Sequence, residues 1–290
     1  MKDYLIRGTA GDGMIRCFAV TAQQVVEEYR AAHEATPVVT AAVGRVLCAA
    51  TMMGAMMKGE KDLLTVQIKG DGPIRGISVT ADSHGHVKGF AYEPQIELPL
   101  APNGKLPVGA AVGQGRLVVI KDLGLKEPYV GQTDLQTGEI AEDLTYYFVV
   151  SEQTPSSVGL GVLVDRDYSV KQAGGFIIQL MPDISDEMIS KLEEKLARIK
   201  PVTTMLEEGL TPEDILREIL GDLDLQIMDK NEVFYRCDCS EDKVRKAIAS
   251  IDKKDIQEMI DDNEPIEVKC QFCNKKYIFD VEQLKEMLVQ

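Results

Sequence analysis

The feature that most restricts the fold of this chain is a pair of short cysteine motifs near its C-terminal end. The sequence reads RCDCSEDK from Arg236 and KCQFCNKKY from Lys269, with thirty residues between Cys239 and Cys270. A segment of about sixty residues is near the lower limit for folding on its own hydrophobic core. Four thiolates, supplied as two close pairs, are a common ligand set of a tetrahedral structural zinc ion. We therefore predict one Zn²⁺ per chain, held by Cys237, Cys239, Cys270 and Cys273.

The spacing alone leaves the role of this site open between a permanently closed structural zinc, which is the default, and redox chemistry at the sulfurs. Six Cys in 290 residues are too few for a disulfide scaffold. The start, MKDYLIRGTAG, lacks the apolar stretch of a secretory signal, so we expect a cytoplasmic protein. In that compartment close cysteine pairs more often bind metal or carry out redox chemistry. Four basic residues stand beside the ligands and are expected to offset the net charge of the thiolates: Arg236, Lys269, Lys275 and Lys276.

Residues 1–182 mix strand and helix patterns and predict an α+β fold, an N-terminal mixed, largely antiparallel sheet domain with helices. Gly11–Asp12–Gly13 is a turn signal between the first two strands, and Thr21 with Gln24 has the spacing of a capping box. Helices are expected at 21–33 and 142–154. Strands are expected at 3–10, 14–20, three within 63–93, 115–122, 158–165 and 174–181.

The stretch from Pro37 to Met57 is apolar and nearly long enough to cross a bilayer. Arg45 lies in its middle, where a charge is costly in lipid. Thr36 followed by Pro37 is an ordinary helix start in a soluble protein. We therefore predict a buried core helix rather than a membrane span.

The composition shifts after Pro182. Residues 183–230 hold thirteen acids and six bases, and their pattern is that of short helices. One helix is expected from Ser185 with an apolar stripe that ends at Pro201, and a second from Thr211 to Gly221. Helices this short depend on docking their apolar face. The domains are thus predicted as an N-terminal core at 1–182, an acidic helical linker at 183–231 and a small C-terminal four-cysteine zinc domain at 232–290.

Over essentially its whole length the chain resembles the 33 kDa chaperonin family of redox-regulated heat-shock chaperones, also called HslO. The resemblance is carried by the two cysteine pairs and by QFCNKKY around the last of them. It is also carried by RGTA at 7–10, by VGLGVLVDRDYSVKQAGGFIIQLMP from Val158 and by EEGLTPEDIL in the linker. The four ligand positions show no departure from the family pattern.

The resemblance implies a chaperone, not an enzyme, that is zinc-bound and inactive when reduced. It implies that the oxidised form holds unfolding proteins without ATP, with disulfides between Cys237 and Cys239 and between Cys270 and Cys273. The expected partners are unfolded client proteins and a second copy of the chain, at least when oxidised. Neither nucleic acid nor membrane is expected.

Two other classes of protein are less well supported. A zinc ribbon that binds nucleic acid needs a basic face, yet residues 232–290 hold ten bases against fourteen acids and the whole chain carries a charge of −15. A thiol oxidoreductase places its C-x-x-C at a helix N-terminus, whereas QFC precedes the strand-like KKYIF. Cys17 and Cys48 lie in apolar runs and are predicted to be buried and dispensable for switching. His33, His84 and His86 form no catalytic pattern.

Overall fold

The structure is a computed structural model that describes residues 2–289. Contacts divide the chain into two compact units, Met1–Arg236 and Cys237–Gln290. Residues 232–236, which the sequence pattern groups with the cysteines, therefore pack with the large unit. The predicted α+β class with a small C-terminal four-cysteine part is confirmed.

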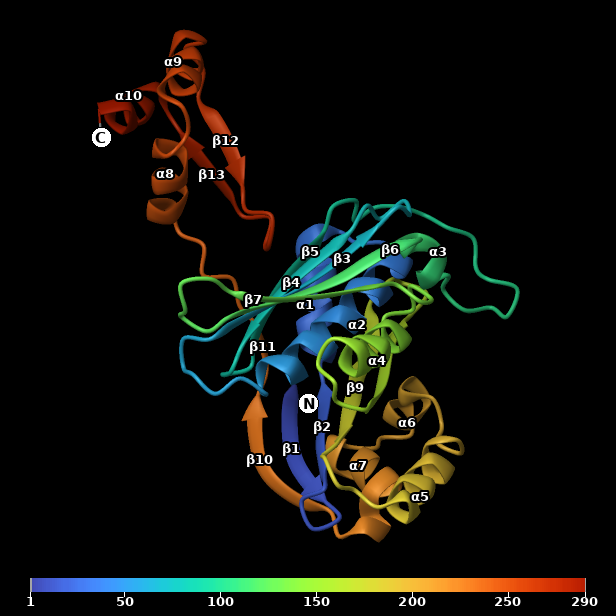
Figure 1. Cartoon of the computed structure of the whole chain (residues 1–290). Coiled ribbons are helices and arrows are strands. Elements are labelled where there is room, and N and C mark those ends of the chain that lie inside the picture. Colours follow the sequence, from blue (N-terminus) through green and yellow to red (C-terminus); the bar gives the residue numbers. More distant parts are fainter. Residues whose placement is uncertain (1, 290) are drawn as a thin grey trace. The chain divides into compact units, whose positions relative to one another are not determined.

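The strands described in the large unit form two sheets rather than one (Figure 1). Neighbouring strands are antiparallel except β11, which runs parallel to β5. The five-stranded sheet has the order β10 (Gln226–Glu232), β1 (Tyr4–Ala10), β2 (Ile15–Thr21), β9 (Val170–Leu180), β8 (Ser156–Val164). The six-stranded sheet has the order β11 (Phe234–Tyr235), β5 (His86–Ala91), β4 (Ile77–Asp82), β3 (Leu63–Gly70), β6 (Gly115–Asp122), β7 (Tyr129–Asp134).

Two strands were not predicted from the sequence. β7 and β10 lack a regular apolar alternation, and every residue of β10 is exposed. β10 also corrects the description of residues 183–231 as a helical linker, because the end of this segment belongs to the strand Gln226–Glu232. Its backbone pairs with β1, so a tertiary partner decides its conformation rather than its own sequence.

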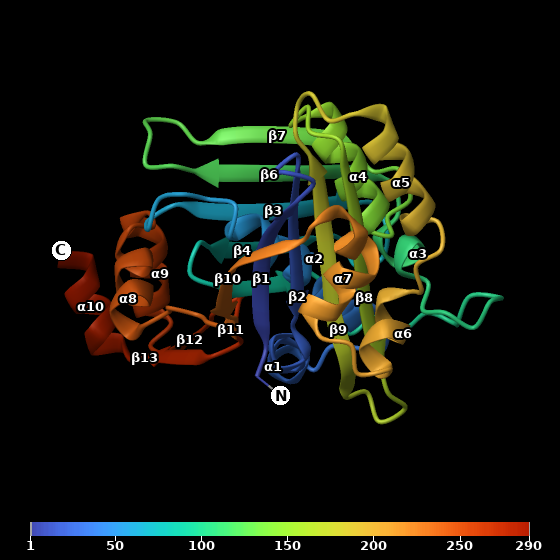
Figure 2. The same ribbon diagram turned by 90° about the horizontal axis from the view of Figure 1, so that it is seen from below.

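The core of the large unit surrounds the helix α2 (Pro37–Gly54), which contacts strands of both sheets (Figures 1 and 2). Among the described residues it is the one helix long and apolar enough to cross a membrane, and 89% of it is buried in the protein. The predicted core helix is therefore confirmed, and Arg45 forms an ion pair with Glu139 at 2.6 Å. The other helices of this part are α1 (Gln23–His33), α3 (Val108–Val112) and α4 (Ala141–Val150).

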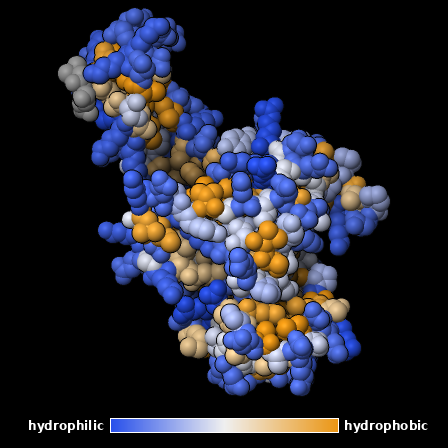
Figure 3. All heavy atoms as spheres, viewed as in Figure 1, coloured by the Kyte–Doolittle hydropathy of each residue, from blue (hydrophilic) through white to orange (hydrophobic). Residues whose placement is uncertain are grey.

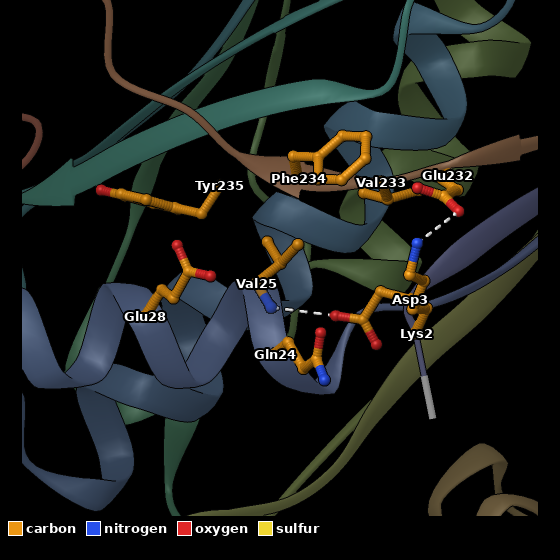
Figure 4. A pocket seen from close by; sticks show the side chains of 9 residues that line it. All are labelled: Lys2, Asp3, Gln24, Val25, Glu28, Glu232, Val233, Phe234 and Tyr235. Atoms are coloured by element: carbon orange, nitrogen blue, oxygen red, sulfur yellow. Dashed lines mark hydrogen bonds and ion pairs between the residues drawn. The ribbon is translucent and has the colours of Figure 1, made fainter.

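The predicted capping box of α1 is wrong. Ala22 is the N-cap and makes no side-chain cap, because Thr21 ends β2 and pairs with Tyr4 of β1. The cap comes instead from Asp3, whose carboxylate accepts a 2.9 Å hydrogen bond from the N–H of Val25 (Figure 4). A residue twenty-two positions away thus provides the hydrogen-bond acceptor for an N–H group in the first turn of the helix.

The acidic linker contains three helices, α5 (Asp186–Leu196), α6 (Val202–Glu207) and α7 (Pro212–Leu220), and a short 3₁₀ turn at Gly221–Leu223. The predicted starts are confirmed, since Ser185 caps α5 and Thr211 forms a capping box with Asp214. α6 was not predicted. The helices cover the face of the five-stranded sheet opposite α2, and apolar side chains still gather at the surface over this region (Figure 3).

A second apolar cluster, here called the linker cluster, joins these helices to the sheet. Its fully buried sheet residues include Ile6, Ile15 and Cys17, and its linker residues include Leu192 and Ile215. Several of its apolar members are only partly buried. These are Leu180, Ile184, Met188, Leu196, Ile199, Leu210, Leu223 and Leu225.

Between β10 and β11 the chain passes from one sheet to the other. The N–H of Val233 donates to the carbonyl of Asp3 (3.1 Å), and the N–H of Phe234 donates to that of Gly85 (2.9 Å). The hydroxyl of Tyr235 donates to the carbonyl of Gly89 at 3.0 Å. This two-residue strand anchors the end of the linker on the large unit (Figure 4).

The described residues of the small unit form one antiparallel hairpin and three helices. The hairpin is β12 (Ile266–Lys269) with β13 (Lys276–Phe279), and the helices are α8 (Glu241–Ala249), α9 (Lys253–Asp261) and α10 (Val281–Val289). The predicted helices are confirmed. Its described core is small. The buried apolar side chains are Ile248, Ile256, Tyr277, Phe279, Leu284 and Met287.

Candidate metal and redox site

Two turns of the small unit carry the four cysteines. Cys237 and Cys239 precede α8, which begins at the cap Ser240. Cys270 and Cys273 lie in the turn between β12 and β13, which is closed by hydrogen bonds from Asn274 N to Cys270 O (2.8 Å) and from Cys270 N to Lys275 O (3.0 Å). Both pairs are thus held by the backbone next to a regular element.

The structure brings all four predicted ligands together. Their Sγ atoms lie within 4.8 Å of one another. The Sγ atoms of Cys237 and Cys270 are 3.6 Å apart, and those of Cys239 and Cys273 are 3.4 Å apart. Metal–sulfur bonds of about 2.3 Å in a tetrahedron place sulfurs about 3.8 Å apart, whereas a disulfide requires about 2.0 Å. The cluster therefore fits four free thiol groups around one metal ion.

Hydrogen bonds around the sulfurs favour the charged form at one of them. Burial opposes ionisation of Cys239, but bonds from Tyr277 and from the neighbouring cysteines lower its pKa to about 7. The hydroxyl of Tyr277 lies 3.1 Å from this Sγ. Burial raises the pKa values of Cys237 and Cys273 in the same cluster. Cys239 therefore ionises more readily than Cys237 or Cys273.

Tyr277 is a site residue that the sequence reasoning missed. It is the second residue of β13, four positions after Cys273, and its ring belongs to the small core. A hydroxyl that donates to a ligand sulfur is the kind of outer-shell contact that orients metal ligands. Its only sequence signal was an aromatic residue on the strand that follows the last cysteine.

Three of the four basic residues expected to offset the thiolates have other partners. Lys276 forms an ion pair with Glu267 at 3.1 Å, and the Nη1 atom of Arg236 lies 3.0 Å from Nε2 of His86. The ammonium of Lys275 lies over the ring of Tyr277. Nearby backbone amides assist the sulfurs instead: the N–H of Cys239 donates to Cys237 and that of Lys275 to Cys273.

The two remaining cysteines are buried, as predicted. Cys17 lies in the linker cluster and Cys48 in the main core around α2, and both have no exposed surface. Burial raises the pKa of Cys17 to about 12 and also raises that of Cys48. Neutral buried thiols react poorly with oxidants, because the thiolate is the reactive form.

The profile of the protein family described as Hsp33 protein matches residues 3–280 of the chain. The chain belongs to the Hsp33 family. The 33 kDa chaperonin of Agathobacter rectalis is 61% identical over 287 residues, which cover 99% of this chain and 100% of the relative. That of Clostridioides difficile is 53% identical over 289 residues, with 99% of each chain covered.

The Hsp33 fold is matched as well. The crystal structure of the 33 kDa chaperonin, or heat shock protein 33 homologue, of Thermotoga maritima superposes with a TM-score of 0.93 at 38% identity, covering 100% of this chain and 98% of that one. Chaperonins are a non-enzymatic class. The predicted family, and with it a chaperone rather than an enzyme, is confirmed.

Proposed function

We propose that this Hsp33 chain is an ATP-independent holdase that is zinc-bound and inactive when reduced and that binds unfolding proteins when oxidised. The observation that carries the proposal is the placement of four clustered thiols in a unit with few buried side chains of its own. The all-sulfur donor set favours zinc as the metal. When bound, zinc stabilises the fold of such a unit, by about 10–16 kcal/mol in zinc-finger peptides.

Oxidation removes the ligands of this site. Each disulfide forms from two cysteine sulfurs and passes two electrons to an oxidant such as hydrogen peroxide. Residue spacing and family resemblance support the pairs Cys237 with Cys239 and Cys270 with Cys273. The two short sulfur–sulfur contacts join Cys237 to Cys270 and Cys239 to Cys273, which belong to different pairs. All four Sγ atoms nevertheless lie within 4.8 Å of one another, so each sulfur is also close to the sulfur of its own pair. Without its ligand set the small unit loses its stabilisation and unfolds.

The linker helices detach when the small unit unfolds, because they are short and incompletely buried. α5, α6 and α7 have between 6 and 11 residues, lengths that are marginal without docking. Their release uncovers the sheet side of the linker cluster as an apolar surface for clients. The sheet residues involved are Tyr4, Ile6, Ala10, Ile15, Cys17, Ala19, Phe176 and Ile178.

In functional terms we assign residues 1–182 to the chaperone core, 183–231 to the linker and 232–290 to the redox switch, whose first residues, 232–236, stay with the large unit as its anchor. The partners are unfolded client proteins in the cytoplasm and a second copy of the chain in the oxidised state. Nucleic acid and membrane are not partners in this proposal, consistent with the charge of −15.

Reduced protein is expected to contain one zinc per chain, measured by elemental analysis beside a thiol titration. Substituting Cys237→Ser and Cys270→Ser together removes one ligand from each turn and should abolish stoichiometric zinc. The matched control is Cys17→Ala with Cys48→Ala, which leaves the four ligands unchanged. Stoichiometric zinc in the double serine variant would refute the four-thiolate site.

Oxidative activation is expected to survive the loss of both buried cysteines. The variant with Cys17→Ala and Cys48→Ala should lose some stability, because each change removes a packed sulfur, by about 1 kcal/mol. After oxidation it should still release zinc and suppress light scattering by an aggregating client enzyme. Loss of activation with fold and zinc retained would place the switch at a buried cysteine.

A further inference from the structure

We propose that β1 is the docking strand for extended segments of client proteins, and that β10 is a removable plug that covers its edge in the reduced protein. The inference rests on the proposed function and adds the backbone edge of β1 to the client surface on the face of the sheet. It follows from how β10 is attached, from which backbone groups of β1 it covers and from the side chains it contributes.

β10 is held by its backbone and by surface charges. All seven of its residues are exposed, and Met228 is 61% exposed. Two of its side-chain links are exposed ion pairs, Arg7 with Asp229 and Lys2 with Glu232. Ion pairs of this kind contribute little to stability. Lys230 pairs with the partly buried Glu213, and its ammonium lies 3.7 Å from the ring centroid of Tyr4, a contact worth about 0.5–1 kcal/mol at an exposed site. The side chains of β10 therefore do little to select it as the partner of β1.

The pairing is also imperfect. The register shifts between Arg7 and Gly8, where β10 has one extra residue. A Cβ atom at Gly8 would lie 2.7 Å from the carbonyl oxygen of Gln226, so β10 approaches closely only because residue 8 is glycine. Because the bulge interrupts the hydrogen bonds between β10 and β1, a regular strand in the place of β10 can form more of them.

Backbone groups of β1 alternate between its two neighbours. The N–H of Tyr4 points to β2, where it donates to the side-chain Oγ1 of Thr21 at 3.3 Å, so the even-numbered residues face β2. The carbonyl of Asp3 accepts from Val233 and the N–H of Gly11 donates to Leu223, so the odd-numbered residues face the linker side. Release of β10 thus frees the amides of Leu5, Arg7 and Thr9.

The freed edge favours alternating apolar side chains. Tyr4 and Ile6 belong to the linker cluster, and their partners across the ladder are Glu232 and Lys230. A client strand in place of β10 can put apolar side chains at these two positions, against the sheet face that the linker helices vacate. The partner is therefore an extended polypeptide with apolar residues at alternate positions, bound through main-chain hydrogen bonds that tolerate many sequences.

Amide hydrogen exchange of the full chain, resolved by residue in NMR spectra, tests this docking. Oxidation should speed exchange at Leu5, Arg7 and Thr9 by about 10-fold or more, and an excess of reduced, carboxymethylated α-lactalbumin should slow it again. The amides of Ile6, Gly8 and Ala10, which face β2, should stay slow and serve as internal controls. Oxidised protein that holds this client while the three odd-numbered amides still exchange fast would overturn the proposal.

A peptide pair separates backbone from side-chain binding. The probe is an extended peptide of alternating Val and Thr with a Lys at each end, and its partner is the same peptide N-methylated at alternate residues on one edge. The methylated peptide should bind the oxidised chain about 10-fold more weakly, because it loses several hydrogen bonds. Equal affinities of the two peptides would overturn docking at β1 but leave the proposed function intact. Oxidised protein that neither binds peptide nor suppresses aggregation would refute the proposed function, and this inference with it.

Discussion

Leu192→Asp is expected to produce a chaperone that holds clients while still reduced and zinc-loaded. Leu192 is 4% exposed in the linker cluster, so the change removes about 2 kcal/mol of apolar burial and forces a carboxylate into an apolar site at a cost of several more. The short linker helices cannot absorb such a loss. Suppression of light scattering by unfolding citrate synthase should approach that of oxidised wild-type protein, while zinc content stays at one per chain.

Ser190→Asp is the matched control, because it places the same charge on the exposed face of the same helix. It should leave the reduced protein inactive. Hydrogen exchange over residues 183–225 should rise in Leu192→Asp and remain at the wild-type level in Ser190→Asp. If both variants behave like reduced wild type in exchange and holding, the docking of α5 does not restrain activity.

Removing zinc from the reduced protein is expected to unfold the small unit while the sheets of the large unit stay folded. The six buried apolar side chains described in the small unit contribute about 1.5–3 kcal/mol each before the entropy of ordering the chain is counted, so this core cannot maintain the unit alone. A strong chelator with a thiol reductant should therefore abolish exchange protection at β12, β13 and α8. Protection at β2, β3 and β9 should persist.

Restoring zinc under the same reducing conditions is the control and should return protection to the hairpin. This experiment needs no oxidant and no client, so it tests the stabilising role of the metal by itself. A hairpin that stays protected after complete removal of zinc would show that the small core folds unaided and that oxidation must act by another route.

Sequence reasoning found the features whose signal is local. The spacing of the four cysteines, the caps at Ser185 and Thr211 and the buried helix from Pro37 depend on residues close together in the chain, and the structure confirms their placement. The cap of α1 by Asp3 was missed, because it joins residues that are distant in sequence.

The strand β10 and the hydroxyl of Tyr277 were missed for related reasons. β10 has a polar sequence whose extended conformation comes from pairing with β1. Tyr277 looks like an ordinary strand aromatic until the fold brings its oxygen to Cys239. The sequence therefore predicted which four cysteines cluster but not the contacts that support them, which only the folded chain assembles.

The anchor formed by β11 has a consequence for the return to the resting state. While Tyr235 stays bonded to Gly89 and β9 stays in its sheet, a freed linker is a closed loop fixed at both ends. Closing such a loop limits the entropy that the linker gains on release. It also keeps β10 near β1 at an effective concentration on the order of millimolar. In the proposed cycle we therefore expect β10 to be a tethered competitor of every bound client, with weakly held segments displaced first when the cysteines are reduced again.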